Sequence, residues 1–470
     1  MTSSPTPTAA DTTVDTTKVL KAMPGLVFIF VFGILCLQAF NFVFADIGAD
    51  LGAPEQASLI TAIPGVVLGI ACVIYGSLGD FVSLRRLMLV GLVLIVVGSV
   101  LGLLSGSSIW LVIIARAIQT AGCQVAGSVY LVVATKYAPG AKKVIYFGVF
   151  TAAYQFSTAV GIVAAGQLSR VNWTWLFIIP LLSLFFAPSL LANLPDVRGR
   201  AQRIDVIGFV IAGFMVGSLV IFFSTQKWWL LGLFVVLLVV FGAYIAKAKD
   251  PFVSPAFFAN RRYLMAVSLI LVFYLGQYAM NPLFNSVGAA LYGRNTMAMS
   301  FVLLWANLVG GATGMLSGRI VGWIGRGPGI LLAGILMALS AFLAAFTLES
   351  GIWAIGLSAI FFFAGLAMMY SPVVDTVVGT VDVSESGRAV GLNDLAMNVS
   401  PSIGVAIFGA LMSSSAFAQV TVTGASAGQA AHFSVIFLIL GAISVAGVVW
   451  FLVVRRHLYA DAWGRASAQE

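Results

Sequence analysis

One charged residue of the chain lies within a long apolar segment of the sequence. Arg116 lies well inside an apolar segment, 109–136, that is long enough to cross a membrane as a helix. A buried arginine in such a helix costs at least about 2.5 to 3.5 kcal/mol, so its side chain must face a cavity or a partner. Gln119 and Cys123 share its helix face, and Gln119 is placed to orient the guanidinium or to contact a bound molecule. A structural pin, bonded to backbone carbonyls, is the alternative.

A polar stripe marks a second apolar segment, 264–287. Its polar residues recur at spacings of three and four, so they share one face of a helix; they are Tyr274, Gln277, Tyr278, Asn281 and Asn285. The segment 25–45 carries Gln38 and Asn41. Two such stripes predict the walls of a central cavity, although polar residues also join helices to one another.

Acidic residues inside apolar segments are few. Asp46 and Asp375 lie near the ends of their segments, whereas Asp394 lies further inside, with Asn398 one helical turn away. Asp394 is the strongest candidate for a group that gains and loses a proton. A structural ion pair, in which Asp375 and Arg388 take part, explains it equally well.

Small residues gather in the segment 144–168. Gly161 and Gly166 permit close approach to the other half and sliding against it. Packing alone explains these glycines equally well.

A short pattern recurs in two loops. Residues 76–86 read GSLGDFVSLRR, and residues 318–328 read GRIVGWIGRGP. Each loop joins the second and third helices of a group of six, which predicts two related halves that rock about a central site.

The first of these loops predicts a latch. Gly76 opens it, and Asp80 lies beside Arg85 and Arg86. These charges can form hydrogen bonds that hold two halves together in one state and release them in another.

The elements that carry these residues must lie in lipid. Hydrophobic residues make up 61% of the 470 positions and charged residues only 9%, which excludes a water-soluble globular protein. Cys36, Cys72 and Cys123 fall inside predicted helices as small hydrophobic residues, and no metal site is expected. Attraction to one membrane face explains the net charge of +8 better than nucleic-acid binding does.

Apolar runs bounded by charges, Gly or Pro predict fourteen membrane helices in an all-α fold, arranged as six, two and six. They lie near 25–45, 57–79, 87–104, 109–136, 144–168, 174–194, 206–223, 230–246, 264–287, 297–321, 329–348, 353–379, 389–412 and 433–454. The corresponding regions are a disordered tail (1–24), a first half (25–194), a central insertion (195–262), a second half (263–454) and a final tail (455–470).

Lysine and arginine predict the orientation. If the amino terminus is cytoplasmic, the loops on the opposite side contain only Arg170, Lys227 and Arg294. This asymmetry satisfies the positive-inside rule, so both termini are expected in the cytoplasm.

Several motifs resemble those of the fourteen-helix drug:proton antiporters of the major facilitator superfamily, and within it the tetracycline exporters of Gram-positive bacteria. They are ADIGAD at 45–50, the loop at 76–86, ARAIQ followed by Gly122 at 115–122, IDVIG at 204–208 and DPFV at 250–253. The resemblance covers nearly the whole chain and implies the major facilitator fold and export driven by a proton gradient.

The chain departs from that family where protons would be carried. Relatives have a Gly-Pro pair in the fifth helix, whereas here Gly161 is followed by Ile162. They also place glutamates in the fifth and thirteenth helices, where this chain has Thr158 and Pro401.

The first hypothesis is therefore a proton-coupled exporter of amphipathic small molecules, without a cofactor, acting as a monomer in a bacterial cell membrane. The second is a uniporter or importer of a small metabolite on the same fold. A membrane enzyme or sensor is a third, which the lack of paired catalytic carboxylates, metal clusters and nucleotide loops disfavours.

Overall fold

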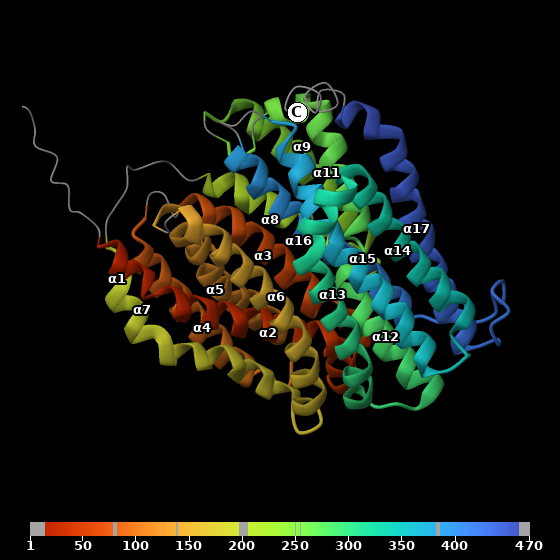
Figure 1. Ribbon diagram of the computed structural model, residues 1–470. Helices are drawn as coiled ribbons and strands as arrows, with labels where there is room; N and C mark the ends of the chain where they lie inside the picture. Colours follow the sequence, from red (N-terminus) through yellow and green to blue (C-terminus); the bar gives the residue numbers. More distant parts are fainter. Residues whose placement is uncertain are drawn as a thin grey trace, which may run out of the picture.

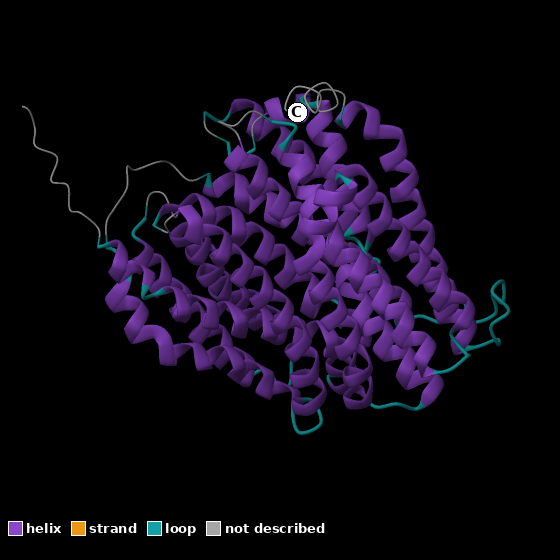
Figure 2. Cartoon of the chain, viewed as in Figure 1, coloured by secondary structure: helices purple, strands orange, loops and turns teal. Residues whose placement is uncertain are grey.

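The computed structural model describes residues 15–78, 82–137, 140–196, 205–249, 251–253, 255–381 and 386–459. Within these ranges the regular structure is helical and contains no strand (Figure 2). Helices suit such an apolar chain because they satisfy their own backbone hydrogen bonds in lipid.

The first six predicted helices are all present. They are α2 (Met23–Asp50), α3 (Leu59–Leu78), α4 (Leu84–Leu103), α5 (Ile109–Lys136), α6 (Gly140–Leu168), and η2 (Trp173–Phe186) continued by α7 (Ala187–Asn193). A short helix, α1 (Thr16–Leu20), precedes them, and the 3₁₀ turn η1 (Pro54–Gln56) joins α2 to α3.

The central pair and the second half follow the predicted order. The central helices are α8 (Val206–Thr225) and α9 (Trp228–Lys247), followed by the short α10 (Pro255–Ala259). The second half consists of α11 (Arg261–Phe273) with α12 (Gln277–Tyr292), α13 (Thr296–Ile324), α14 (Arg326–Thr347), α15 (Ile352–Val378), α16 (Ser386–Met412) and α17 (Gln429–Leu458).

Thirteen segments of the described chain are long and apolar enough to cross a membrane. The 29-residue helix α6 takes the place of the remaining predicted span. The all-α architecture of six, two and six helices is thereby confirmed.

The two halves lie side by side, with the first half in warm colours and the second in green to blue (Figure 1). They meet where α3 packs on α16, α6 on α13 and α2 on α12. Helix α8 packs on α3 and α16, and α9 packs on α8. Apolar side chains of α9 such as Val236 and Val239 remain exposed, as expected of a surface in lipid.

The bundle has two faces, which we name after a residue on each. The Asp50 face carries the end of α2 and the loop between α12 and α13. The Arg86 face carries the start of α4 and, because the number of spans is even, both described ends of the chain, Asp15 and Tyr459.

The predicted helix 264–287 is interrupted, which the apolar pattern did not indicate. Helix α11 ends at Phe273 and α12 begins at Gln277. Gly404 of α16 packs against this interruption, because a Cβ at Gly404 would lie 1.7 Å from the carbonyl oxygen of Leu275. Only a residue without a side chain permits this approach.

Candidate functional site

Arg116 lies at the centre of a buried polar group in the first half. Its side chain is 1% exposed, and its Nη1 donates to Oε1 of Gln119 at 3.0 Å. The guanidinium carbon lies 4.3 Å from the ring centroid of Phe40, a cation–π contact. The predicted pairing of Arg116 with Gln119 is present, and the guanidinium makes no hydrogen bond to a described backbone carbonyl.

The side-chain amide nitrogen of Gln119 makes two further hydrogen bonds. Its Nε2 donates to Oγ of Ser99 at 2.8 Å and to the carbonyl of Phe177 at 3.3 Å. The amide therefore presents its oxygen to Arg116 and orients the guanidinium.

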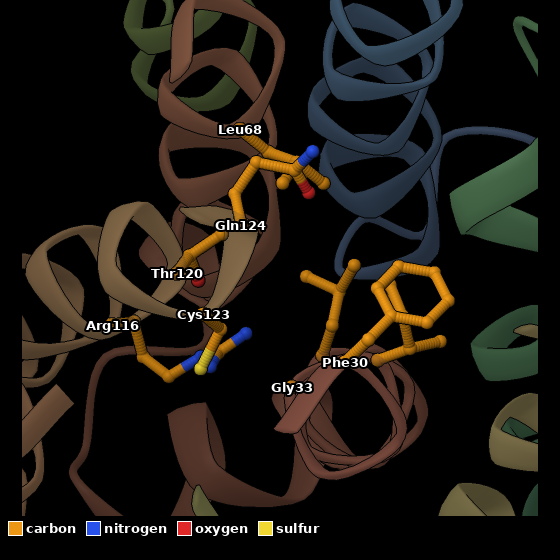
Figure 3. A pocket seen from close by; sticks show the side chains of 9 residues that line it. Phe30, Gly33, Leu68, Arg116, Thr120, Cys123 and Gln124 are labelled. Atoms are coloured by element: carbon orange, nitrogen blue, oxygen red, sulfur yellow. The ribbon is translucent and has the colours of Figure 1, made fainter. Parts of the chain in front are cut away.

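A small cavity adjoins Arg116 between α2, α3 and α5 (Figure 3). Cys123 lines it together with Arg116, as their spacing predicted. Nε and Nη2 of Arg116 have no hydrogen-bond partner among the described residues.

The polar residues of α2 join two helices of the same half. Nδ2 of Asn41 donates to Oε1 of Gln38 at 3.1 Å, and Nε2 of Gln38 donates to Oγ1 of Thr158 in α6 at 3.3 Å. Both α2 residues are buried. The predicted cavity wall is thus a packed contact, which was the alternative explanation for the stripe.

The stripe on α12 also makes packed contacts, but one of them points towards α16. Asn281 accepts a hydrogen bond from Nδ2 of Asn307 in α13 at 3.3 Å. Tyr278 donates its hydroxyl to Oδ1 of Asn398 in α16 at 3.1 Å. Oε1 of Gln277 has no partner among the described residues.

The two glycines of α6 face different neighbours, which corrects the expectation that both lie against the other half. A Cβ at Gly161 would meet the carbonyl oxygen of Leu35 in α2 at 2.6 Å. A Cβ at Gly166 would meet Oγ of Ser300 in α13 at 2.6 Å. Five residues turn an α-helix by about 500°, which is one full turn and about 140° more, so the two glycines cannot share a face.

Asp394 lies in the interior between the halves. It is nine residues into α16, about 12 Å along the helix axis from the Arg86 face. Its side chain is only partly buried, and it interacts electrostatically with Cys72 of α3 and Tyr370 of α15. Nδ2 of Asn393 donates to its carboxylate at 3.3 Å. Asp375, one member of the alternative ion pair, is bound to Arg326, and the side chain of Arg388 lies outside the described residues.

Tyr370 lies near this acid, and three further tyrosines, from both halves, lie near Tyr370 or near one another. Tyr154 of α6 interacts electrostatically with Tyr370, and both Tyr274 and Tyr278 interact with Tyr154. Tyr370 is 51% exposed although its neighbours belong to the interior of the bundle. We call Asp394 and these four tyrosines the tyrosine cluster.

The halves also touch directly at the Asp50 face. Thr296 of α13 donates its hydroxyl to Oδ2 of Asp46 in α2 at 2.8 Å. Nη1 of Arg170 lies 2.9 Å from Sδ of Met297. These contacts join the two halves at this face.

The family model of the Major Facilitator Superfamily matches residues 26–405. The chain belongs to this superfamily. A curated relative, Multidrug resistance protein 3 of Bacillus subtilis, is 28% identical over 81% of this chain and 73% of its own length. The transporter EfpA of Mycobacterium tuberculosis is 29% identical over 42% of this chain and 39% of its own length.

Solved superfamily structures have the same fold. A POT family transporter crystallised with a peptide conjugate has a TM-score of 0.65 and 14% identity, covering 94% of this chain and 96% of that one. A D-xylose–proton symporter has a TM-score of 0.62 and 16% identity, covering 93% of this chain and 96% of that one. The fold alone follows from these structures; the family match and the named relatives show that the chain is a transporter and not an enzyme.

The repeated loops of this superfamily member place an arginine at equivalent helix starts. Arg86, at the start of α4, lies 3.5 Å from the carboxylate of Asp196. Arg326, at the start of α14, lies 2.6 Å from Asp375 at the end of α15. The first pair joins α4 to the segment after α7, the second joins α14 to α15, and each lies within one half. Asp80, the centre of the predicted latch, lies outside the described residues, as do the surroundings of Gly76.

Sequence reasoning missed Tyr154 and Tyr370. Each is a single aromatic residue in an apolar helix, and such residues are normally core or lipid contacts. The only available signal was their polar hydroxyl inside a span that crosses the bilayer, where an unsatisfied polar group is costly.

Proposed function

We propose that the protein exports amphipathic small molecules by alternating access, in exchange for protons. The tyrosine cluster carries this proposal, because both halves of a transporter fold contribute side chains near one carboxylate, Cys72 from the first half and Tyr370 from the second. Aromatic rings offer large apolar contact area and a polar edge, which suits ligands that are partly apolar and partly polar. The name of the Bacillus subtilis relative supports multidrug export.

Asp394 is the group that we assign to proton coupling. A carboxylate with no cationic partner among the described residues, in a site of low dielectric constant, changes its charge readily as the water around it changes. Protonation from one side and substrate binding from the other then compete for the same carboxylate. Asp46, whose hydrogen bond to Thr296 joins the halves, is the second candidate.

We place the Arg86 face in the cytoplasm of a bacterial cell, with both termini there. The lysines and arginines that gather on this face support this orientation. The contacts of Asp46 and Arg170 then close the outer side, and the tyrosine cluster communicates with the cytoplasm.

The second candidate function is a uniporter or importer of a small metabolite. Thr158 favours it, because this residue stands where antiporter relatives carry a glutamate and is bonded to Gln38. Efflux of a lipophilic fluorescent dye from proteoliposomes, with and without an imposed pH gradient, separates the two. The exporter moves dye uphill only with the gradient, whereas movement that is only downhill and never responds to the pH gradient supports the second candidate.

A further inference from the structure

We propose that the cavity beside Arg116 binds a small monovalent anion. The anion is either a free ion such as chloride or the acidic group of an organic molecule. This site is separate from the carboxylate of the tyrosine cluster, and the proposal does not depend on the direction of transport.

The charge of Arg116 is not neutralised by the protein that surrounds it. The side chain is 1% exposed, and the described residues offer it no carboxylate. Besides Gln119, its Nη1 contacts only Sγ of Cys36 among the described residues, at 3.6 Å, and a neutral thiol does not balance the charge. The ring of Phe40 offsets only part of the cost of burial, because a cation–π contact contributes about 0.5 to 2 kcal/mol. A buried cation of this kind requires an anion nearby.

Arg116 lines the cavity, and two nitrogen atoms of its guanidinium have hydrogen-bond donors that are not used by the described residues. Nε and Nη2 lack partners among the described residues, whereas Nη1 is engaged by Gln119. Figure 3 shows the guanidinium between the helix of Cys123 and that of Gly33. A water molecule could satisfy these donors, but it would leave the positive charge in place.

Thr120 supplies a second and independent indication. Its side chain is 4% exposed, its hydroxyl has no partner among the described residues, and it lines the same cavity. A hydroxyl and a guanidinium that converge on one space are both donors, and together they suit an anion.

The size of the cavity limits the ligand. Its volume is about 10 Å³, far below the roughly 300 to 1,000 Å³ typical of drug-sized ligands. A Cβ at Gly33 would lie 2.7 Å from Cβ of Cys123, so α2 and α5 are already in close contact there. The site therefore accepts a single ion or one terminal acidic group, and not the body of a large molecule.

The test is the thermal stability of the purified full-length protein in detergent. Sodium chloride and sodium acetate are titrated separately against sodium gluconate at constant ionic strength, because gluconate is too large for the cavity. We expect a saturable rise in the unfolding temperature with at least one of the two small anions. A rise with chloride alone identifies the ligand as a free ion, and a rise with acetate alone identifies it as the acidic group of an organic molecule.

Two matched variants locate the effect. Thr120→Val keeps the shape of the side chain and removes the hydroxyl, so the half-maximal anion concentration should rise at least about tenfold. Thr61→Val removes another buried hydroxyl without a described partner, outside this cavity, and should respond as the wild type does. The proposal is overturned if neither anion differs from gluconate, or if Thr120→Val and Thr61→Val respond alike. Neither of these results tests the proposed transport function, which is measured separately by dye efflux.

Discussion

Gly404 lies directly against the backbone of Leu275, at the point where α11 gives way to α12. The interruption brings Tyr278 towards Asn398, one turn from Asp394 on α16. The polar contacts around Asp394 therefore depend on Gly404, although this residue has no side chain with which to make a polar contact.

The first prediction concerns Gly404→Ala. The added methyl group would overlap the carbonyl oxygen of Leu275, so we expect a loss of at least about 1 to 3 kcal/mol in stability, with little folded protein recovered. Size-exclusion profiles and unfolding temperatures measure this. Gly242→Ala is the control, since nothing lies within 4 Å of a Cβ there. Equal stability of the two variants would show that α16 does not fix the interruption.

The second prediction concerns Asp205, which begins α8. Its carboxylate accepts hydrogen bonds from the amides of Gly208 at 2.8 Å and Phe252 at 3.0 Å, and from the hydroxyl of Tyr244. Asp205→Ala removes the helix cap and both links, and should cost about 1 to 2 kcal/mol or more. Tyr244→Phe removes one link and should lower the unfolding temperature less. The opposite order would contradict this account.

The third prediction concerns Arg116→Lys. A lysine carries the charge but cannot reproduce the planar guanidinium that stacks on Phe40 and bonds to Gln119, so transport should fall at least about tenfold at equal expression. Dye efflux from cells measures the change. Normal efflux by Arg116→Ala would show that the buried charge is dispensable.

The fourth prediction concerns orientation. A cysteine at Arg261, on the Arg86 face, should resist a membrane-impermeant thiol reagent added to intact cells, and should react after lysis. A cysteine at Arg294, on the Asp50 face, should react in intact cells. The native cysteines lie in membrane helices, so the unmodified protein gives the background. Strong labelling of the Arg261 variant from outside would reverse the topology.

Much of the fold follows from the sequence, because lipid makes long apolar runs helical whatever surrounds them. The predicted span 109–136 is the observed α5, and the spacing of Arg116 and Gln119 predicted their contact. Periodicity within one helix does not report which helix lies opposite. Gly161 and Gly166 were therefore assigned to one interface although they belong to two.

The tyrosine cluster was missed for a related reason. Tyr154 and Tyr370 lie far apart in the sequence and show no repeat of their own. Asp394 could be selected because a single acid in an apolar helix is costly wherever it lies. Its aromatic neighbours only become apparent when the two halves are brought together.

The central claim is that Asp394 couples export to proton entry, and one measurement tests it most directly. Proteoliposomes that contain wild type, Asp394→Asn or Asp46→Asn are given the same imposed pH gradient, and uphill movement and gradient-free exchange of dye are both recorded. We predict that Asp394→Asn loses uphill movement and retains exchange, because the amide binds substrate but cannot release a proton. Full uphill transport by both variants, or a wild type that never responds to the gradient, would contradict the claim.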